Sequence, residues 1–376
     1  MIFAVDGKAR TLKNSDDALT AKEKAAIEKQ KDILDEIMKL YAEKALDRPT
    51  DFTACAREMF AMRRSKKCRD KFTHYFSPED AKRFDEQMAG KFGGIGLELT
   101  QKEDMVVVVA PIDGTPASRA GIEAMDIILK VDGKETENVN EATLLIRGKP
   151  GTKVKLTIFR KKSGKEIEFT LIREEIVIHS VKRRVSLADS KIGIIKISQF
   201  DKNLPLKFAE AVGELAKKGA NEIIIDLRDN PGGYVHSVLA MLGLFAQKDD
   251  IFLTIRYRHS EEIITFNNMP FWAKRSRMIA SQELMRNLNK MSLKDASIAI
   301  LINNGSASAS EIFAGTMQDW GYPVIGEKSF GKGVGQELIR LSDNSRIALT
   351  TFEFLVGNKK VVIRDKGVKP GIMVKM

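Results

Sequence analysis

Apolar residues recur at helical spacing in the first quarter of the chain. From Thr20 the sequence TAKE has the form of a capping box, and apolar residues follow it on one helical face. A second helical stretch ends near Lys67, and SPED at 77–80 predicts a third helix with Ser77 as its N-cap. We therefore expect residues 1–90 to form an all-helical region, whose apolar stripes are internal packing faces or a dimer contact.

Beyond residue 91 the pattern changes to short strands separated by glycine turns. FGGIGLEL, MVVVVAPI and AMDIILKVDGK predict strands, and alternation after Lys153 predicts a hairpin that turns at Ser163-Gly164. These elements predict a small domain at 91–175. A glycine-rich loop enters its first strand, so that backbone N–H groups lie beside a sheet edge and can hold a peptide carboxylate; a plain tight turn is the alternative. The peptide-binding candidates are Gly93, Gly94, Ile95, Gly96 and Leu97.

Residues 176–376 alternate between apolar strands and helices. KIGIIKISQF, NEIIIDLRDN and SIAILINN are nearly continuous apolar runs, which are typical of a sheet buried on both faces. SRIALTTFEF and KKVVIRD predict two further strands near the end. The segment between Ile264 and Ser297 is long, and we interpret it as a helical lid, a partner surface or a segment packed on the core.

The overall charge is basic, at +11 with a pI near 9.4, but acidic residues are interspersed along the whole chain. No basic block carries interleaved aromatic residues, so we expect no nucleic-acid partner. A solvated surface or attraction to an anionic membrane surface explains the charge equally well.

The spacing of the cysteines and histidines does not indicate a cofactor site. Cys55, Cys68 and the four histidines match no metal-ligand pattern, so neither a metal nor another cofactor is expected. The opening MIFAVDGKAR lacks the features of a signal peptide, and no run of 18 apolar residues occurs. We expect the chain as given to be soluble and to work in the cytoplasm or after removal of a targeting segment.

Two later motifs suggest nucleophilic chemistry. Ser308 follows a strand and a Gly305 turn and precedes a helix, whose free N–H groups could stabilise an oxyanion; a capping box with Glu311 is the alternative. A serine needs a base, and His236 is the only histidine near a motif. Lys332 lies between two glycines, but its pKa would have to fall from about 10.4 to near neutrality, whereas an ordinary lysine is solvated.

The order of the motifs resembles a known family. GGIG, GTPASRAGI and MDIILKVDG resemble a PDZ domain, although Met125 stands where that pattern has glycine. DLRDNPGG, GSASASEIFAGTMQD and SFGKGVGQ, in this order, resemble the carboxy-terminal processing peptidases, which are Ser-Lys endopeptidases. The resemblance covers roughly residues 69–376. It implies a multidomain α+β fold, with a PDZ-like domain inserted before a crotonase/Clp-like α/β protease core at 176–376.

The resemblance also implies roles for residues. Ser308 would be the nucleophile, Lys332 its general base, and Gln336 the residue that orients the lysine amine, with Ser306 and Ser310 as non-catalytic neighbours. The implied backbone donors of the oxyanion hole are Ala309 and one of Gly232 and Gly233. The separation of Ser308 from Lys332 is one residue shorter than the family pattern, and Gly371 replaces the usual acidic residue after the last proline.

The same resemblance implies partners and a location. Substrates would be proteins or peptides with small or apolar C-termini held by the PDZ-like domain, with Arg147 as a coupling residue or a plain surface arginine. The resemblance also implies an extracytoplasmic location, the export signal being absent from this chain. Apart from the resemblance, we expect a homodimer, with the N-terminal helical region as its contact, and an activating partner for a latent site. The competing interpretations are an inactive or latent PDZ-type binding protein that recruits C-terminal tails and, more distantly, a crotonase-like acyl-transfer enzyme.

Overall fold

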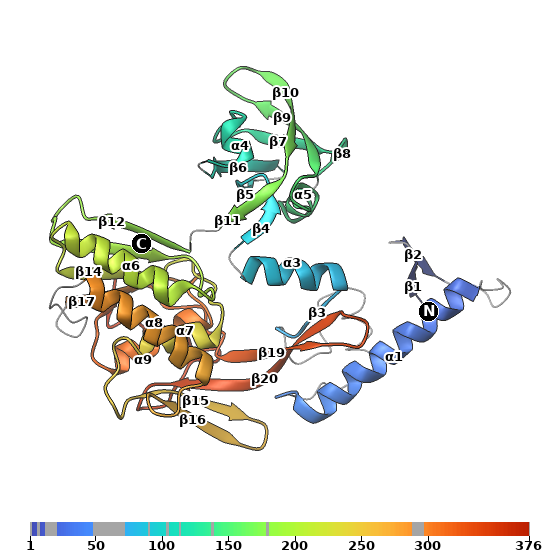
Figure 1. The fold of residues 1–376 in the computed structure, drawn as a ribbon. Helices are drawn as coiled ribbons and strands as arrows, with labels where there is room; N and C mark the ends of the chain where they lie inside the picture. Colours follow the sequence, from blue (N-terminus) through green and yellow to red (C-terminus); the bar gives the residue numbers. More distant parts are fainter. Residues whose placement is uncertain are drawn as a thin grey trace. The chain divides into compact units, whose positions relative to one another are not determined.

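The chain divides into two compact units, drawn with labelled helices and strands in Figure 1. The computed structural model describes residues 2–5, 8–11, 21–47, 72–88, 91–102, 105–112, 114–136, 139–177, 180–287 and 297–375. One unit comprises residues 83–179, and the other combines residues 1–82 with residues 180–376. The exact domain limits expected from the sequence, 91–175 and 176–376, stay a prediction.

The smaller unit is built on an antiparallel sheet with the strand order β10-β9-β7-β6-β5 and with β8 beside β7. Its strands are β5 (Leu97–Lys102), β6 (Met105–Pro111), β7 (Ile127–Val131), β8 (Lys134–Glu135), β9 (Lys153–Arg160) and β10 (Lys165–Ile172). The unit also contains α4 (Pro116–Arg119), α5 (Val139–Ile146) and the paired strands β4 (Lys91–Gly94) and β11 (Glu174–Val177). The hairpin predicted after Lys153 is confirmed, with Arg160 opposite Lys165 and Gly164 at a φ of 67°.

The larger unit contains a mainly parallel sheet with the order β12-β13-β14-β17-β18-β22, in which only the β12–β13 pair is antiparallel. Its strands are β12 (Val181–Val185), β13 (Ile192–Ile197), β14 (Glu222–Asp226), β17 (Ser297–Ile302), β18 (Val324–Gly326) and β22 (Ile372–Met373). All interior positions of β13, β14 and β17 are buried or half-buried, as expected for a sheet covered on both faces.

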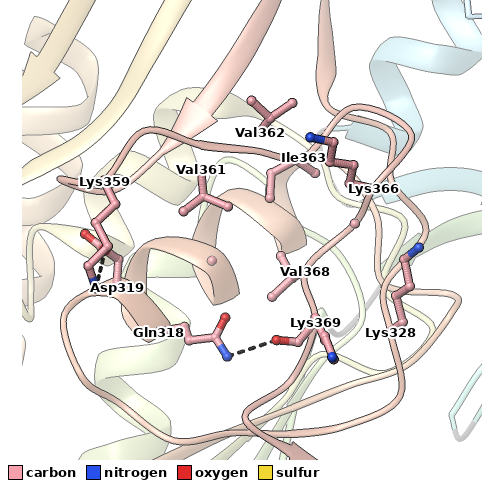
Figure 2. A pocket seen from close by; sticks show the side chains of 12 residues that line it. Gln318, Asp319, Lys328, Lys359, Val361, Val362, Ile363, Lys366, Val368 and Lys369 are labelled. Carbon is pink, nitrogen blue, oxygen red and sulfur yellow. Dashed lines mark hydrogen bonds and ion pairs between the residues drawn. The ribbon is translucent and has the colours of Figure 1, made fainter.

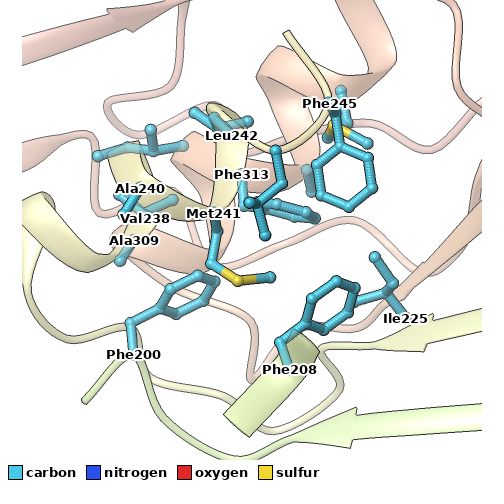
Figure 3. Close-up of a cluster of buried hydrophobic side chains, with 14 of the residues drawn as sticks. Phe200, Phe208, Ile225, Val238, Ala240, Met241, Leu242, Phe245, Ala309 and Phe313 are labelled. Atoms are coloured by element: carbon cyan, nitrogen blue, oxygen red, sulfur yellow. The ribbon is translucent and has the colours of Figure 1, made fainter. Parts of the chain in front are cut away.

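Helices α6 (Leu204–Lys217), α7 (Val235–Leu242) and α9 (Ala309–Asp319) contribute to one large apolar core with this sheet. Figure 3 shows part of this core, where Met241 and several phenylalanines meet. The ring of Phe313 on α9 lies 6.1 Å from that of Phe200 and 6.0 Å from that of Phe245. Burial of each such side chain contributes about 1.5–3 kcal/mol, so these contacts fix the position of α9.

A second, antiparallel sheet in the same unit has the order β16-β15-β20-β19, and β21 and β3 also pair with β20. Its strands are β3 (His74–Phe76), β15 (Ile251–Tyr257), β16 (Glu261–Thr265), β19 (Val334–Arg340), β20 (Arg346–Val356) and β21 (Val361–Val362). The two strands predicted near the end of the chain are confirmed as β20 and β21, the second of only two residues.

The N-terminal region is not all-helical, and that expectation is wrong. β1 (Ile2–Val5) pairs with β2 (Lys8–Thr11), and β3 pairs with β20. A strand forms at β3 because the edge of β20 offers hydrogen-bonding partners about 270 residues away, which local patterns cannot reveal. The predicted cap at Thr20 and the predicted helix ending near Lys67 lie outside the described residues.

Two helical predictions in this region are confirmed. α3 (Pro78–Met88) begins after Ser77, whose hydroxyl accepts a hydrogen bond from the Asp80 N–H at 3.1 Å. α1 (Ala21–Lys44) packs on β19 and β20, and the shared cluster contains Ile33, Ile37, Tyr41, Ala45, Leu341, Ile347 and Leu349. The buried stripe of α1 is therefore a packing face within this unit.

The segment between Ile264 and Ser297 forms the end of a hairpin and then a helix, α8 (Phe271–Asn287). Ala273, Ala280 and Leu284 are buried in the core that α8 shares with α6 and α7. Trp272, in contrast, is 63% exposed. Of the alternatives proposed for this segment, packing on the core is therefore confirmed for the inner face of α8. Trp272 does not take part in this packing.

Candidate active site

Ser308 lies at the sharp turn between β17 and α9. It has a φ of 56° and a ψ of −115°, a conformation that residues other than glycine rarely adopt and that costs about 1–3 kcal/mol. Its neighbours Ser306 and Ser310 are fully buried, and their hydroxyls donate to the carbonyl oxygens of Leu227 (2.8 Å) and Asn230 (2.9 Å). Of the three serines, only Ser308 is partly exposed.

The Asn230-Pro231-Gly232-Gly233 loop is pressed against Ser308. The carbonyl oxygen of Asn230 accepts the N–H of Ala307 at 3.0 Å, and its side-chain amide donates to the carbonyl oxygen of Ile197 at 2.9 Å. A methyl group at Gly232 would lie 2.8 Å from the Cβ of Ser308. Only glycine allows this close approach of the two loops.

Two backbone N–H groups of these two loops have no acceptor among the described residues. They belong to Ala309, the first residue of α9, and to Gly233. The N–H of Gly232, in contrast, donates to Oδ1 of Asn230 at 2.9 Å. Of the two glycines proposed from the sequence, Gly233 is therefore the one with an available donor.

One carboxylate connects the serine turn to the lysine loop. Glu311 is fully buried, and its oxygens accept hydrogen bonds from the N–H of Ser308 (2.8 Å), the hydroxyl of Ser329 (2.6 Å), and the N–H groups of Gly331 (2.6 Å) and Lys332 (2.9 Å). The predicted capping contact of Glu311 with Ser308 is thus present. The same side chain also holds the backbone on which Lys332 is carried.

Lys332 is half-buried between glycines that the loop requires. Gly331 and Gly333 have φ values of 88° and 47°, and a methyl group at Gly333 would lie 2.0 Å from the backbone nitrogen of Arg364. The ammonium nitrogen of Lys332 is 5.3 Å from the centroid of the Phe72 ring, within cation–π range.

Gln336 lies on β19 directly after a β-bulge at Gly335. Its side-chain amide donates to Oγ1 of Thr350 on β20 at 3.3 Å. Gln336 is thus on the strand that leaves the lysine loop, and this hydrogen bond joins it to β20.

The glycine-rich loop of the smaller unit lies at the free edge of its sheet, because β5 ends the strand order. The N–H groups of Ile95 and Gly96 donate to no acceptor within the described part of the chain. The loop is tightly packed: a methyl group at Gly93 would lie 2.0 Å from the carbonyl oxygen of Gly148, and one at Gly96 2.4 Å from Thr115. Gly94 pairs with β11, and Leu97 begins β5.

Arg147 follows the end of α5 in the same unit. Its guanidinium carbon lies 4.5 Å from the centroid of the Phe92 ring, and Phe92 belongs to β4, the strand that runs into the glycine-rich loop. The two positions predicted for peptide binding, the loop and Arg147, therefore meet through β4.

Comparison with known proteins identifies both units. Residues 93–186 match the sequence model of the PDZ domain, and residues 191–374 match that of peptidase family S41. The chain belongs to peptidase family S41. The PDZ domain precedes the S41 domain, as predicted, and the mixed α/β fold agrees with the family.

Similar proteins include the carboxy-terminal processing protease CtpA of Bacillus subtilis. It is 34% identical over 310 residues, which cover 82% of this chain and 61% of that protein. A probable CtpA-like serine protease of Staphylococcus aureus is 33% identical over 312 residues, or 82% of this chain and 58% of the relative. The chain thus spans about three fifths of the length of these relatives.

Two solved structures share the fold. A photosystem II D1 C-terminal processing protease superposes with a TM-score of 0.54 at 23% identity, covering 92% of this chain and 93% of that structure. An S41 protease described as putative, from Bacteroides fragilis, superposes with a TM-score of 0.56 at 16% identity, covering 91% and 90%.

The charged groups near the S41 site have distinct environments. Burial lowers the pKa of His236, and Lys202 lowers it further; its ring stacks on Tyr234 at 4.8 Å. Burial alone would raise the pKa of Asp226, but bidentate hydrogen bonds from Arg228 (2.8 and 2.6 Å) outweigh it and lower this pKa. His236 is therefore neutral near pH 7 and Asp226 is ionised.

The S41 domain brings most of the predicted site together. Gly232 lies against Ser308 and Ala309, and Gly233 follows it in the same loop. Glu311 joins the backbone of Lys332 to that of Ser308. The sequence pattern predicts only a cap at Glu311 and gives no sign of the Asp226–Arg228 pair within DLRDN or of the contact of Phe72 with Lys332. Within the ranges that the structure describes, no cluster of three or more metal-ligating side chains occurs, and none of the helices could span a membrane.

Proposed function

We propose that this protein is a serine endopeptidase with a Ser308–Lys332 dyad, which cleaves proteins near their C-terminus while its PDZ domain holds the substrate tail. The observation that carries the proposal is the carboxylate of Glu311, which binds the N–H groups of both Ser308 and Lys332. It joins the serine turn to the lysine loop, and the N–H groups of Ala309 and Gly233 have no acceptor among the described residues. The family membership of the chain supports the same chemistry.

In the proposed reaction, the neutral amine of Lys332 takes the proton of the Ser308 hydroxyl as the oxygen attacks the scissile carbonyl carbon. The carbonyl oxygen becomes an oxyanion and accepts hydrogen bonds from Ala309 and Gly233, assisted by the positive end of α9. The lysine proton passes to the leaving amine, and the C–N bond breaks. Water then attacks the acyl ester with Lys332 again as base, which restores Ser308. Gln336 is assigned to orient the lysine amine.

The PDZ domain supplies the substrate tail in this proposal. The tail adds as a strand beside β5, its terminal carboxylate accepts hydrogen bonds from Ile95 and Gly96, and apolar end residues contact the side of α5. We assign Arg147, next to this loop, to coupling of tail binding with the S41 domain.

We further propose an extracytoplasmic location, from the family, and contact with an anionic membrane surface, from the net charge of +11. A homodimer and an activating partner complete this proposal. Cell fractionation tests the location, and light scattering of the purified chain tests the dimer. Recovery of the enzyme only in the cytoplasmic fraction, or a monomeric mass at micromolar concentration, would overturn these two assignments.

The decisive experiment compares cleavage of an unfolded protein that ends in apolar residues by the wild type, Ser308→Ala and Lys332→Ala. Ser310→Ala is the matched control, because that serine lies two residues away with its hydroxyl bound to Asn230. We expect the wild type and the control to cleave, and the two site variants to bind the tail without cleaving it. A wild type that binds but never cleaves would favour the binding-protein alternative, and cleavage by Ser308→Ala would refute the mechanism.

A further inference from the structure

A pocket lies in the S41 domain, at the opposite end of α9 from Ser308. It has a volume of about 510 Å³, within the range of small-molecule sites. Figure 2 shows that its lining comes from the end of α9, the loop after β18, the turn before β21 and the segment that follows β21. None of the residues assigned to catalysis lines it.

The rim of the pocket is positively charged. Four lysines line it, namely Lys328, Lys359, Lys366 and Lys369, against the single carboxylate of Asp319. That carboxylate is almost fully buried and already bound, because it accepts the N–H of Asn358 at 2.6 Å and pairs with Lys359 at 3.3 Å. Lys328, Lys366 and Lys369 form no ion pair within the described residues. Three cations are therefore available to a ligand.

The wall between these lysines is apolar. Ile363 and Val368 are buried, and Val361 is 44% exposed. Gln318 is occupied, because its amide donates to the carbonyl oxygen of Lys369 at 3.0 Å. The pocket thus combines a cationic rim with an apolar wall, which matches a ligand with one anionic head group and a short apolar chain.

The pocket adjoins the lysine loop. The N–H of Ser329 donates to the carbonyl oxygen of Val368 (3.1 Å), the N–H of Val368 donates to Oγ of Ser329 (2.7 Å), and the N–H of Asp365 donates to the carbonyl oxygen of Gly331 (2.9 Å). Lys328 lies on one of these paired segments, and Lys366 and Lys369 lie on the other. An anion held by both segments would clamp the loop that carries Lys332.

We propose that this pocket binds a single-chain amphipathic anion, a fatty acid or an alkyl phosphate, and that binding stabilises the loop of residues 328–333. The two ligand sources share an anionic head group on an apolar chain. Binding itself does not depend on the proposed protease activity, so the two proposals can fail separately.

Calorimetric titration of the full chain with octanoate, octyl phosphate and acetate tests the site. The pocket variant replaces Lys328, Lys366 and Lys369 by Gln, and the control variant replaces three exposed lysines elsewhere, Lys182, Lys191 and Lys217, by Gln. We expect the pocket variant to weaken octanoate binding at least tenfold and the control variant to change it less than twofold. Equal binding by the pocket variant and the wild type would overturn the site.

The apolar wall and the effect on the loop have their own readouts. Val361→Ser should weaken octanoate binding and leave that of acetate unchanged, and equal wild-type affinities for acetate and octanoate would overturn the amphipathic ligand. Whichever of octanoate and octyl phosphate binds more tightly identifies the head group. Hydrogen exchange of residues 326–336 should slow at least threefold with octanoate in the wild type but not in the pocket variant. Unchanged exchange at saturation would overturn the clamp.

Discussion

The two sides of the candidate site are built in different ways. Ser308 is positioned by the short junction of β17 and α9, with the Asn230–Gly233 loop against it. Lys332 is positioned by three segments that are distant from it in sequence, because its loop contacts Glu311, the segment around Arg364, and Phe72. The proposed nucleophile thus lies on a short local turn backed by one remote loop, whereas the proposed base is held by contacts from three separate segments. Changes far from Lys332 should therefore affect the base more than the nucleophile.

Gly333→Ala should have the largest effect, because the new methyl group would lie 2.0 Å from the backbone of Arg364 and the lysine loop would have to move. We expect kcat/KM for the unfolded substrate to fall at least 100-fold, since small displacements of a base are costly. Gly321→Ala is the control: that glycine also has a positive φ, 92°, but nothing lies within 4 Å of its methyl position. Wild-type activity in Gly333→Ala would show that the base does not need this packing.

Glu311→Gln should weaken both sides of the site at once. The carboxylate of Glu311 accepts hydrogen bonds from four donors. The amide of glutamine has a single acceptor oxygen, and its N–H₂ group would face some of these donors without being able to accept from them. We expect a loss of about 2–4 kcal/mol in the free energy of unfolding and of about 10- to 100-fold in activity. Urea unfolding and cleavage assays measure these losses, with the exposed Glu222→Gln as control. An unchanged unfolding curve would contradict the bridging role.

Ser306→Ala and Ser310→Ala should act on stability alone. Each removes a buried hydroxyl that donates to a backbone carbonyl, at a cost of about 1–2 kcal/mol. Activity should stay within threefold of the wild type for both. If either variant stays folded but loses activity, the assignment of Ser308 as the nucleophile is wrong.

The smallest effect concerns His236. Its pKa in the folded chain lies below the unfolded value of about 6.5, so its contribution to stability is complete above pH 6.5 and is lost as the pH falls toward the folded pKa. We expect the difference in unfolding free energy between the wild type and His236→Gln to change with pH below 6.5, by at most about 1.4 kcal/mol per pH unit. A difference that is constant from pH 7.5 to 5 would contradict the neutral assignment.

Local patterns predicted those parts of the fold that local interactions specify. The apolar runs at β13, β14 and β17, the hairpin of β9 and β10, and the Ser77 cap are all present. The strand β3 was missed because its partner β20 is remote in sequence. The segment between Ile264 and Ser297 stayed ambiguous because α8 carries large apolar residues on its exposed face as well as on its buried face.

The candidate site shows the same division. The motif around Ser308 and the glycines of NPGG were visible in sequence because each needs an unusual backbone conformation. The choice of Gly233 over Gly232 required the hydrogen bond of Gly232 to Asn230. The bridging role of Glu311 was hidden because an ordinary capping box explains the same spacing.

The pairing of β3 with β20 and the packing of α1 on β19 and β20 have a consequence for synthesis of the chain. Residues 21–47 and 74–76 lack their partners until residue 349 has left the ribosome. At roughly 5–20 residues per second, this delay lasts about 15–60 s. The apolar stripe of α1 would be exposed to other proteins throughout that time, so a segment made long before β20 is among the last to fold.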